Sequence, residues 1–299
     1  MPSRVTQGML NTQLLRNLNS NLNRMDNLQN QLATGRKINK PSDDPVGISF
    51  SMRYRSELSA NDQYKKNVDA TTSWLEYSDT MLDQAGTVLQ RARELAVSGA
   101  NGTNSEESYK AFKNEVDQLY SQMISIGNSQ FNGKYVFNGQ ITDQKPYPDD
   151  ADAMNATPEQ GEIRFEIGLG VRISANVTGT QVFGEAGDET NIYQVLKTLS
   201  EGLDEQDSEK VSSALGLLDE RMSKFLSVRA DVGAKINRIE LAQNRLEDID
   251  LNVQSLKSKI EDADMAEVIT NLKMDENVYQ ASLSAGTKLI MPSLMDYLR

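Results

Sequence analysis

The sequence contains no cysteine and no histidine among its 299 residues. These two absences exclude disulfide bonds, thiol nucleophiles, zinc sites built from Cys and His, and histidine acid–base catalysis. Any catalysis would have to depend on carboxylates, Lys, Tyr or Ser, and no nucleophile–base pair stands out among them. We therefore expect a protein that is not an enzyme and that carries no cofactor and no metal ion.

Aromatic residues are also few, at 6% with a single Trp, whereas charged residues make up 25%. This composition suits long helices better than a thick globular core. No apolar run approaches the roughly 18 residues of a membrane-spanning helix, so we expect no membrane insertion. The formal net charge of −12 argues against a nucleic-acid partner, because such surfaces need clustered Lys and Arg. The first residues, MPSRVTQGML, lack the basic-then-apolar pattern of a secretory signal.

The two ends of the chain carry opposite charge and similar apolar patterns. Basic residues outnumber acidic ones by five up to Ser42, and acidic residues outnumber basic ones by four from Glu261 onward. Apolar side chains recur at both ends with the spacing of coiled-coil seams. Neither helix can bury its seam alone, so we expect the ends to pack on each other or on other copies of the chain. The predicted seam residues are Leu14, Leu18, Leu22, Met25 and Leu32 near the start, and Val268, Leu272, Tyr279, Leu283, Ile290 and Leu294 near the end.

Further helices are predicted in the interior of the chain. Nine positions over residues 68–96 alternate in steps of three and four, and the segment SGANGTNSEES then interrupts the helix. Asn104, three residues before Glu107, predicts the N-cap of a following helix, so we expect an antiparallel helical hairpin. One heptad frame over residues 225–260 predicts a single helix from about residue 208 to 260, roughly 80 Å long.

The pattern changes between these helical stretches. Two Asn-Gly pairs bracket the short run YVF at residues 135–137, which indicates a hairpin. The stretch EIRFEIGLGVRISANVTGTQVFG alternates in short β-favouring runs that Gly residues separate. We therefore predict a mainly α fold, an elongated helical coiled coil or bundle built from both chain ends, with a small β-rich insertion. The predicted domains are residues 1–42 with 262–299, residues 43–130 with 190–261, and residues 131–189.

The stretch QLATGRKINKPSDDPVG at residues 31–47 predicts a joint between two helices. Gly35 suits a helix C-cap, where a left-handed residue is needed. Asp44 before Pro45 fits an N-cap followed by the first helical position. Pro41 and Asp43 complete the break between the helices. Capping accounts for the two adjacent carboxylates better than an acid–base pair does.

A second break is predicted in IEDADMAE at residues 260–267. Its acidic cluster lies about as far from one end of the chain as the first joint lies from the other. The two breaks therefore face each other if the ends run side by side. A calcium loop is disfavoured because its glycine and terminal bidentate Glu are missing. We expect a helix to restart at Asp262 or Asp264 instead.

These motifs resemble, in order and spacing, those of the bacterial flagellin family. The matching stretches are QLATGRKINKPSDDPVG, LQRARELAVSGANGTNSEES, FNGKYVFNG and IEDADMAEVITNL. The resemblance covers roughly residues 3–140 and 190–299 and leaves the middle as an insertion. Within the family, the chain is more similar to the hook-associated proteins of the hook–filament junction than to filament flagellins. The SDDP that follows Pro41, the SWLEY run and the ending SLMDYLR support that branch.

The resemblance implies a structural subunit of the bacterial flagellum, exported through the flagellar type III channel. It implies that residues 1–42 and 262–299 are disordered in the free monomer and line the inner tube after assembly. The implied partners are other copies of the chain, an adjacent hook-associated protein, filament flagellin, and an export chaperone on the C-terminal segment. The protein would be cytoplasmic before export and extracellular afterwards.

Two interpretations of Arg91 and Glu94 remain open. Both residues face away from the apolar seam, as expected of a solvated helix face. The family resemblance instead implies a lateral contact with a neighbouring subunit. Two alternatives to the junction role also remain, namely a filament flagellin, which would polymerise on its own, and a cytoplasmic coiled-coil adaptor, whose ends would be fully helical as a purified oligomer.

Overall fold

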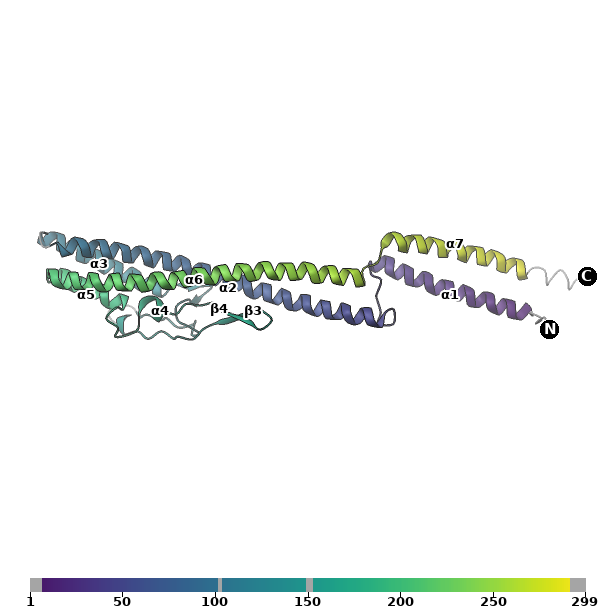
Figure 1. The fold of residues 1–299 in the computed structure, drawn as a ribbon, viewed down its shortest axis with the longest axis horizontal. Coiled ribbons are helices and arrows are strands. Elements are labelled where there is room, and N and C mark those ends of the chain that lie inside the picture. The colour runs from purple at the N-terminus through teal and green to yellow at the C-terminus, as the bar shows by residue number, and fades with distance from the viewer. Residues whose placement is uncertain (1–6, 102–103, 149–152, 291–299) are drawn as a thin grey trace, which may run out of the picture. The chain divides into compact units, whose positions relative to one another are not determined.

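The computed structural model describes residues 7–101, 104–148 and 153–290, and helices dominate it (Figure 1). Its α-helices are α1 (Gln7–Thr34), α2 (Pro45–Ala100), α3 (Glu106–Gly127), α4 (Gly179–Phe183), α5 (Ile192–Asp204), α6 (Ser208–Glu261) and α7 (Met265–Ile290). The strands are β1 (Gln130–Phe131), β2 (Lys134–Tyr135), β3 (Arg164–Gly168) and β4 (Val171–Ser174), and a short 3₁₀ turn covers Ala153–Asn155. The mainly α fold with a small strand-bearing insertion is therefore confirmed.

The chain divides into two compact units. Unit 1 comprises residues 1–60 and 249–299, and unit 2 comprises residues 61–248. This division falls inside α2 and α6, so both helices contribute residues to both units. The predicted division at the joints stays a prediction, since compactness alone does not test which segments act together.

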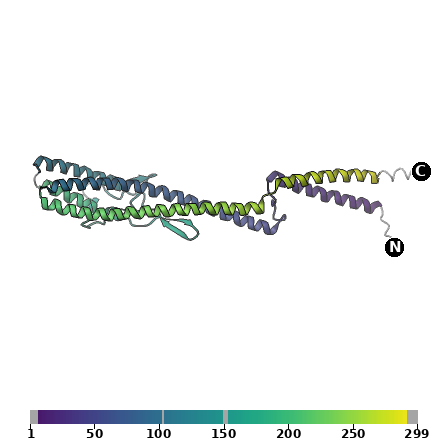
Figure 2. The same ribbon diagram turned by 45° about the horizontal axis from the view of Figure 1, so that its top comes forward.

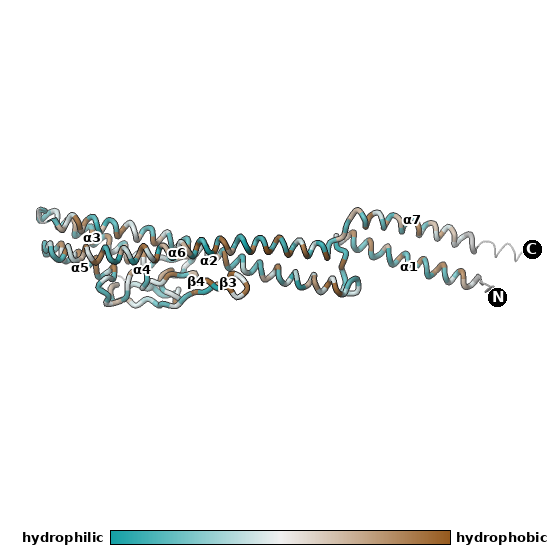
Figure 3. The backbone as a smooth tube through the Cα atoms, in the orientation of Figure 1, coloured by the Kyte–Doolittle hydropathy of each residue, from teal (hydrophilic) through white to brown (hydrophobic). Residues whose placement is uncertain are grey.

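The core of unit 2 forms around α2, α3 and α6. All nine predicted seam positions of α2 over residues 68–96 are fully buried, at 0% exposure. On α6, Phe225, Val232 and Ile239 are each at most 1% exposed, and they belong to the same apolar cluster as the α2 seam. Apolar positions recur along both helices in Figure 3. The 3–4 periodicity thus predicted the buried face correctly, because only side chains three and four residues apart share one side of a helix.

Helices α2 and α3 form the predicted antiparallel hairpin. The hydroxyl of Tyr109, near the start of α3, donates to the carbonyl of Gly99, near the end of α2, at 3.1 Å. The predicted cap was wrong by one residue. The N-cap is Ser105, whose Oγ accepts from the Ser108 amide at 3.3 Å, whereas the Asn104 side chain donates to the carbonyl of Asn101 at 2.9 Å.

A separate helix, α5, packs against α3 in unit 2. Its N-cap Asn191 accepts from the amide of Tyr193 at 2.9 Å. The predicted helical bundle includes this stretch, but no separate helix was predicted for it. The available signal was Asn191 followed by apolar residues on one helical face, of which Val195, Leu199 and Leu203 are at most 1% exposed.

The insertion contains two small antiparallel hairpins rather than one continuous sheet. Asn132 and Gly133 join β1 to β2 at φ values of 51° and 76°, the two left-handed residues of a type I′ turn. Most of the remainder is irregular and packs through aromatic rings. The rings of Tyr147 and Tyr193 have centroids 4.9 Å apart, and Phe183 lies 5.3 Å from Tyr147. Side-chain packing, rather than strand pairing, therefore holds this insertion to the helices of unit 2.

Candidate functional site

Helices α1 and α7 of unit 1 lie side by side and antiparallel (Figures 1 and 2). Leu14, near the start of α1, lies against Gly286, near the end of α7. At the other end of the pair, Arg36 bridges to Asp262 through the backbone. The pairing of the two chain ends, which opposite charge and matching seams predicted, is thus present within one subunit.

The facing positions follow a strict alternation of four and three residues. All of these positions are buried or half-buried. The residues that occupy them are Leu14, Leu18, Asn21, Met25, Leu28 and Leu32 on α1, and Val268, Leu272, Asp275, Tyr279, Ser282 and Gly286 on α7. This is the seam of a two-stranded coiled coil.

A polar layer interrupts this seam. Asn21 is 3% exposed, and its Nδ2 donates to the main-chain oxygen of Asp275 at 2.9 Å. Arg24 donates to the Asn21 side chain at 2.7 Å and pairs with the Asp275 carboxylate at 3.3 Å. A buried amide with a defined partner favours one register of a coiled coil over its neighbours. Sequence reasoning missed Asn21 because it counted only apolar residues.

Two of the predicted seam residues lie outside this contact. Leu22 is 42% exposed and Leu283 is 44% exposed. They stay predictions for contacts with other chains. The side chain of Ile290 and the whole of Leu294 lie outside the described residues.

Exposed apolar side chains concentrate in unit 1. Fourteen of the nineteen large hydrophobic residues that are exposed in the described part of the chain lie there, although unit 1 is the smaller unit. Those on the terminal helices are Met9, Leu10, Leu15 and Leu22 of α1, and Met265, Ile269, Met274, Val278 and Leu283 of α7. Among the described residues, the continuous apolar core, by contrast, is formed by residues of unit 2. Within unit 1, the described residues therefore leave these apolar side chains uncovered.

The joint closes unit 1 through its backbone. Gly35 follows α1 at φ +70° and donates to the Gln31 carbonyl at 2.8 Å, as expected of a left-handed helix C-cap. Its own carbonyl accepts from the amide of Ala263 at 3.0 Å, and the amide of Lys37 donates to the carbonyl of Glu261 at 2.7 Å. The two breaks therefore pair as a short bridge, so the link after α1 is fastened to the link before α7.

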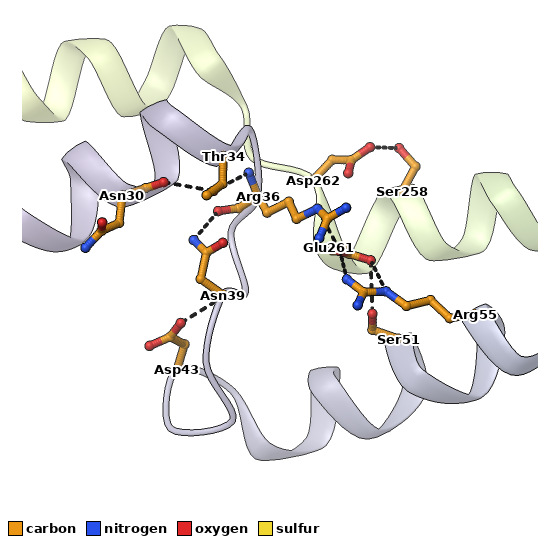
Figure 4. A network of polar contacts seen from close by, with 10 residues as sticks. All are labelled: Asn30, Thr34, Arg36, Asn39, Asp43, Ser51, Arg55, Ser258, Glu261 and Asp262. Atoms are coloured by element: carbon orange, nitrogen blue, oxygen red, sulfur yellow. Dashed lines mark hydrogen bonds and ion pairs between the residues drawn. The ribbon is translucent and has the colours of Figure 1, made fainter.

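The carboxylate of Glu261 is the centre of this joint (Figure 4). Its side chain is 1% exposed and forms ion pairs with Arg36, at 2.9 Å, and with Arg55. The hydroxyl of Ser51 donates to the second carboxylate oxygen at 3.0 Å. Three donors from the link and from α2 thus converge on one buried acid. Sequence reasoning did not single out Glu261, and no local signal could have done so, because its partners lie more than 200 residues away along the chain.

Two opposing effects act on the pKa of Glu261. Burial raises it, because the charged form loses hydration. The hydrogen bonds from Arg55 and Ser51 and the charges of Arg55 and Arg36 lower it, and together they outweigh the burial. The pKa therefore lies below its ordinary value of 4.5, and the carboxylate is ionised at neutral pH.

The predicted joint residues have capping and turn roles in the structure. Asp44 accepts from the amides of Val46 and Gly47 at 3.1 and 2.9 Å, so it caps α2, which begins at Pro45. Pro41 lies in the turn that the Asp43 amide closes onto the Lys40 carbonyl at 3.0 Å. These roles satisfy amides that a helix start leaves free.

The remaining acids of the joint act in the same way. The side chain of Asp43 accepts from the amides of Lys40 and Asn39, and these bonds lower its pKa. Asp264 caps α7 by accepting from the amides of Ala266 and Glu267 at 2.9 and 3.2 Å, whereas Asp262 accepts from Ser258 at 2.6 Å. Of the two candidates, Asp264 is therefore the residue that caps the start of α7. In the described residues, no group of three or more His, Cys, Asp or Glu could hold a metal ion.

Gly47 is expected to tolerate no side chain, because the link packs closely on the first turn of α2. A Cβ at this position would lie 2.6 Å from Cδ1 of the buried Ile38 and would also press on the capping carboxylate of Asp44. We expect Gly47→Ala to cost about 1–3 kcal/mol of local stability, through overpacking and a weakened cap. Faster amide hydrogen exchange over residues 44–50 is the measurement.

Gly8→Ala is the matched control for Gly47→Ala. Gly8 also lies in a helix of unit 1, but among the residues that the structure describes nothing lies within 4 Å of a Cβ there. Since Ala favours helix over Gly, this change is expected to be neutral or slightly stabilising. Unchanged exchange in Gly47→Ala would contradict the steric argument.

Two family models match the chain. The bacterial flagellin N-terminal helical region matches residues 5–142, and the bacterial flagellin C-terminal helical region matches residues 215–298. The chain belongs to the flagellin family. The matched regions contain both terminal helices, both breaks of the joint and α3, so the family pattern covers the surface described above.

Known relatives of this flagellin-family chain include filament and hook-associated proteins. The flagellar filament 30.7 kDa core protein of Treponema maltophilum is 27% identical over 255 residues, which are 85% of this chain and 84% of that protein. The flagellar hook-associated protein 3 of Escherichia coli K12 is 25% identical over 281 residues, covering 87% and 88%. The structure of a putative flagellar hook-associated protein from Vibrio parahaemolyticus shares the fold, with a TM-score of 0.68 and 21% identity over 74% of this chain and 100% of that one.

The predicted lateral residues of this flagellin-family chain already have partners within the subunit. Arg91 pairs with Glu94 at 2.8 Å and with Glu115 of α3 at 2.6 Å. The hydrogen bonds that Arg91 donates to Glu115 and to Glu94 raise the pKa of Arg91. All three side chains remain at least 40% exposed, so a lateral contact with another subunit stays a prediction. Each helix in the described ranges is too short or too polar to cross a membrane.

Proposed function

We propose that this protein is a structural subunit of the bacterial flagellum that joins hook to filament, exported from the cell and without catalytic activity. The observation that carries the proposal is the concentration of exposed apolar side chains on unit 1. Membership of the flagellin family and the relationship to hook-associated protein 3 support the junction role.

The exposed surface of unit 1 favours assembly with other subunits. In unit 1, the hydrophobic residues that are buried are Ile38, Val253, Val268 and Leu272 in the described part of the chain. So small a core leaves the α1–α7 pair marginal, because isolated helices of this length depend on packing for stability. Burial of the outer apolar residues against neighbouring subunits would supply that packing. This agrees with terminal segments, residues 1–42 and 262–299, that order as they assemble and line an inner tube.

The proposed partners follow from this role. They are other copies of the chain, an adjacent hook-associated protein on the hook side, filament flagellin on the other side, and an export chaperone that covers the C-terminal segment in the cytoplasm. The joint at residues 35–45 and 260–265 would absorb the mismatch between the hook and filament lattices. Residues 43–130 with 190–261 would form a helical bundle rod, and residues 131–189 would form a β-rich insertion domain.

A filament flagellin is the second candidate. It is favoured by relatives such as the flagellar filament 33 kDa core protein of Treponema phagedenis, which is 28% identical over 275 residues. A filament subunit would polymerise alone into long filaments, whereas a junction subunit would not.

Gold-labelled antibody on intact cells, viewed by electron microscopy, distinguishes the candidates. A single band where hook meets filament is the result expected of a junction protein. Label along the whole filament would mean a filament flagellin. Label confined to the cytoplasm would overturn both and revive the coiled-coil adaptor.

The apolar surface itself is tested by the double change Ile269→Ser and Met274→Ser on α7. These side chains are 47% and 55% exposed, so their loss leaves the folded chain nearly unchanged. Each would be buried in the assembly, so we expect at least about a tenfold loss of junction labelling. Leu241→Ser, at a 71% exposed position in unit 2, is the control and should keep its label. Equal labelling of the two variants would count against unit 1 as the assembly surface.

A further inference from the structure

The hairpin of β3 and β4 in unit 2 presents one apolar side chain to solvent. Leu169 is 90% exposed, the highest value among the exposed large hydrophobic residues of the described chain. It begins the two-residue turn that joins the strands, and Gly170 follows at φ +70°, the left-handed conformation that the second turn position requires. The turn therefore holds Leu169 at the tip of the hairpin, and this turn is strongly apolar in Figure 3.

The same unit contains a groove that none of the described residues of unit 2 fills. Its volume is about 640 Å³, and it lies between α2, the β1–β2 hairpin and β3. Three aromatic rings, those of Trp74, Phe131 and Phe165, line it together with Ile163. Trp74 and Phe131 meet edge to face, with ring centroids 5.8 Å apart. Fixed aromatic walls of this kind suit an aliphatic side chain.

The charges of hairpin and groove are complementary. Glu166 and Arg172 face each other across the hairpin strands and flank the tip. Asp69 and Lys134 lie on the wall of the groove. In the described part of the chain, the side chains of Arg172, Asp69 and Lys134 have no ion-pair partner. One acid and one base on the hairpin thus match one base and one acid at the groove.

The hairpin cannot fill the groove of its own chain. Phe165 of β3 lines the groove, and Leu169 lies four residues further along, which is about 13 Å in an extended strand. A hairpin tip that occupies this groove must therefore come from another molecule. Because the tip and the groove are different surfaces, such a contact is heterologous and can repeat from copy to copy.

We propose that the β3–β4 hairpin of one copy inserts Leu169 into the groove between Trp74 and Phe131 of a neighbouring copy, with Arg172 facing Asp69 and Glu166 facing Lys134. The contact joins unit 2 to unit 2 and is separate from the apolar surface of unit 1. It rests on the proposed function only because assembly brings copies of the chain together.

Two full-length variants test this contact directly. Trp74 is the only Trp of the chain, so its fluorescence reports on the groove alone. A Leu169→Asp variant keeps the groove but cannot insert its hairpin, whereas a Trp74→Phe variant keeps the hairpin and is silent. Adding the silent variant to the first is expected to shift the Trp74 emission to shorter wavelength. A silent variant that also carries Leu169→Asp should need at least about a tenfold higher concentration for the same shift.

A second measurement examines the contact where copies are held together. The chain has no Cys, so a Leu169→Cys, Ser73→Cys variant carries thiols only at the hairpin tip and the groove wall. A short bismaleimide applied to flagella of cells with this variant is expected to give a ladder of covalent dimers and higher oligomers. Leu169→Cys with Gln90→Cys, an exposed α2 position outside the groove lining, is the control and should give none.

The outcomes separate this proposal from the junction role. A ladder with Ser73→Cys but not with Gln90→Cys supports hairpin docking, as does a Leu169-dependent emission shift. Gold label at the junction without a ladder and without a shift would overturn the docking and leave the junction role intact. If gold label is absent from the junction, the mixing experiment on the purified variants decides the docking by itself.

Discussion

Replacing Glu261 with Gln is expected to destabilise unit 1 by about 3 kcal/mol, at the lower end of the cost of breaking a buried ion pair. The Gln amide would leave the charges of Arg36 and Arg55 without a counter-charge at a side chain that is 1% exposed. The two Arg side chains are themselves 47% and 43% exposed, so water can reach them, which keeps the cost from being larger. Amide hydrogen exchange of Lys37 and Ala263, which hold the two breaks together, is the measurement.

Glu94→Gln provides the matched control for Glu261→Gln. Glu94 also pairs with an arginine, but its side chain is 66% exposed, and ion pairs of this kind contribute little. We expect no measurable change in exchange at the joint. Equal exchange rates at the joint in the two variants would show that the burial of Glu261 does not contribute to the stability of the joint.

Acid is expected to weaken the joint in the same way as the Glu261→Gln change. The pKa of Glu261 is below 4.5 in the folded chain, so ionised Glu261 stabilises the joint fully above pH 4.5, and this contribution is lost as the pH falls through the lowered pKa. Exchange at Lys37 and Ala263 should therefore accelerate below pH 4.5 beyond the intrinsic pH dependence of amides. The Glu261→Gln variant should lack this additional step.

Replacing Phe225 with Ala is expected to cost unit 2 about 3–5 kcal/mol, the usual cost of removing a fully buried ring. Phe225 is 1% exposed, and its ring lies over Gly86 of α2, 3.3 Å from where a Cβ would stand. Gly86 has no side chain that could fill the space left by the missing ring, so the cavity would remain. Denaturant unfolding of the full chain, followed by far-ultraviolet circular dichroism, measures the loss.

Leu226 offers a control at the next position of the same helix. Its side chain is 56% exposed, so Leu226→Ala removes little buried surface and should change the unfolding free energy by less than about 1 kcal/mol. A similar loss for both variants would mean that the buried face of α6 is not the one the structure shows. Junction labelling should survive Leu226→Ala and be reduced by Phe225→Ala, because a destabilised subunit is degraded before assembly.

Much of the helical architecture follows from local chemistry. The 3–4 alternation of the α2 seam predicted nine buried positions because a helix repeats every 3.6 residues. Gly35 and Asp44 predicted a helix end and a helix start because cap residues satisfy amides and carbonyls only a few residues away. Asn132 and Gly133 likewise predicted the first hairpin through the φ values that its turn requires.

Other features escaped the sequence because they depend on distant partners or on competing local signals. The seam of α1 uses Asn21, not Leu22, because the α7 carbonyl of Asp275 is within reach of a side-chain donor. The insertion forms two short hairpins and much irregular chain, since burial of Tyr147, Phe183 and Tyr193 outweighs strand pairing. The N-cap of α3 is Ser105 and not the predicted Asn104, because both adjacent residues have a side-chain oxygen that can accept from a helix amide.

The sequence by itself determined the long helices, the buried face of α2, the two breaks and the family, because each of these depends on residues close together in the chain. Only the tertiary structure decided that Arg36, Ser51 and Arg55 all bind the carboxylate of Glu261. It also decided that Leu169 lies at a hairpin tip and that Trp74 lines a groove. Contacts across more than 200 residues leave no periodic trace in the sequence. They arise when packing brings the ends of long helices together, and that is where the candidate assembly surface lies.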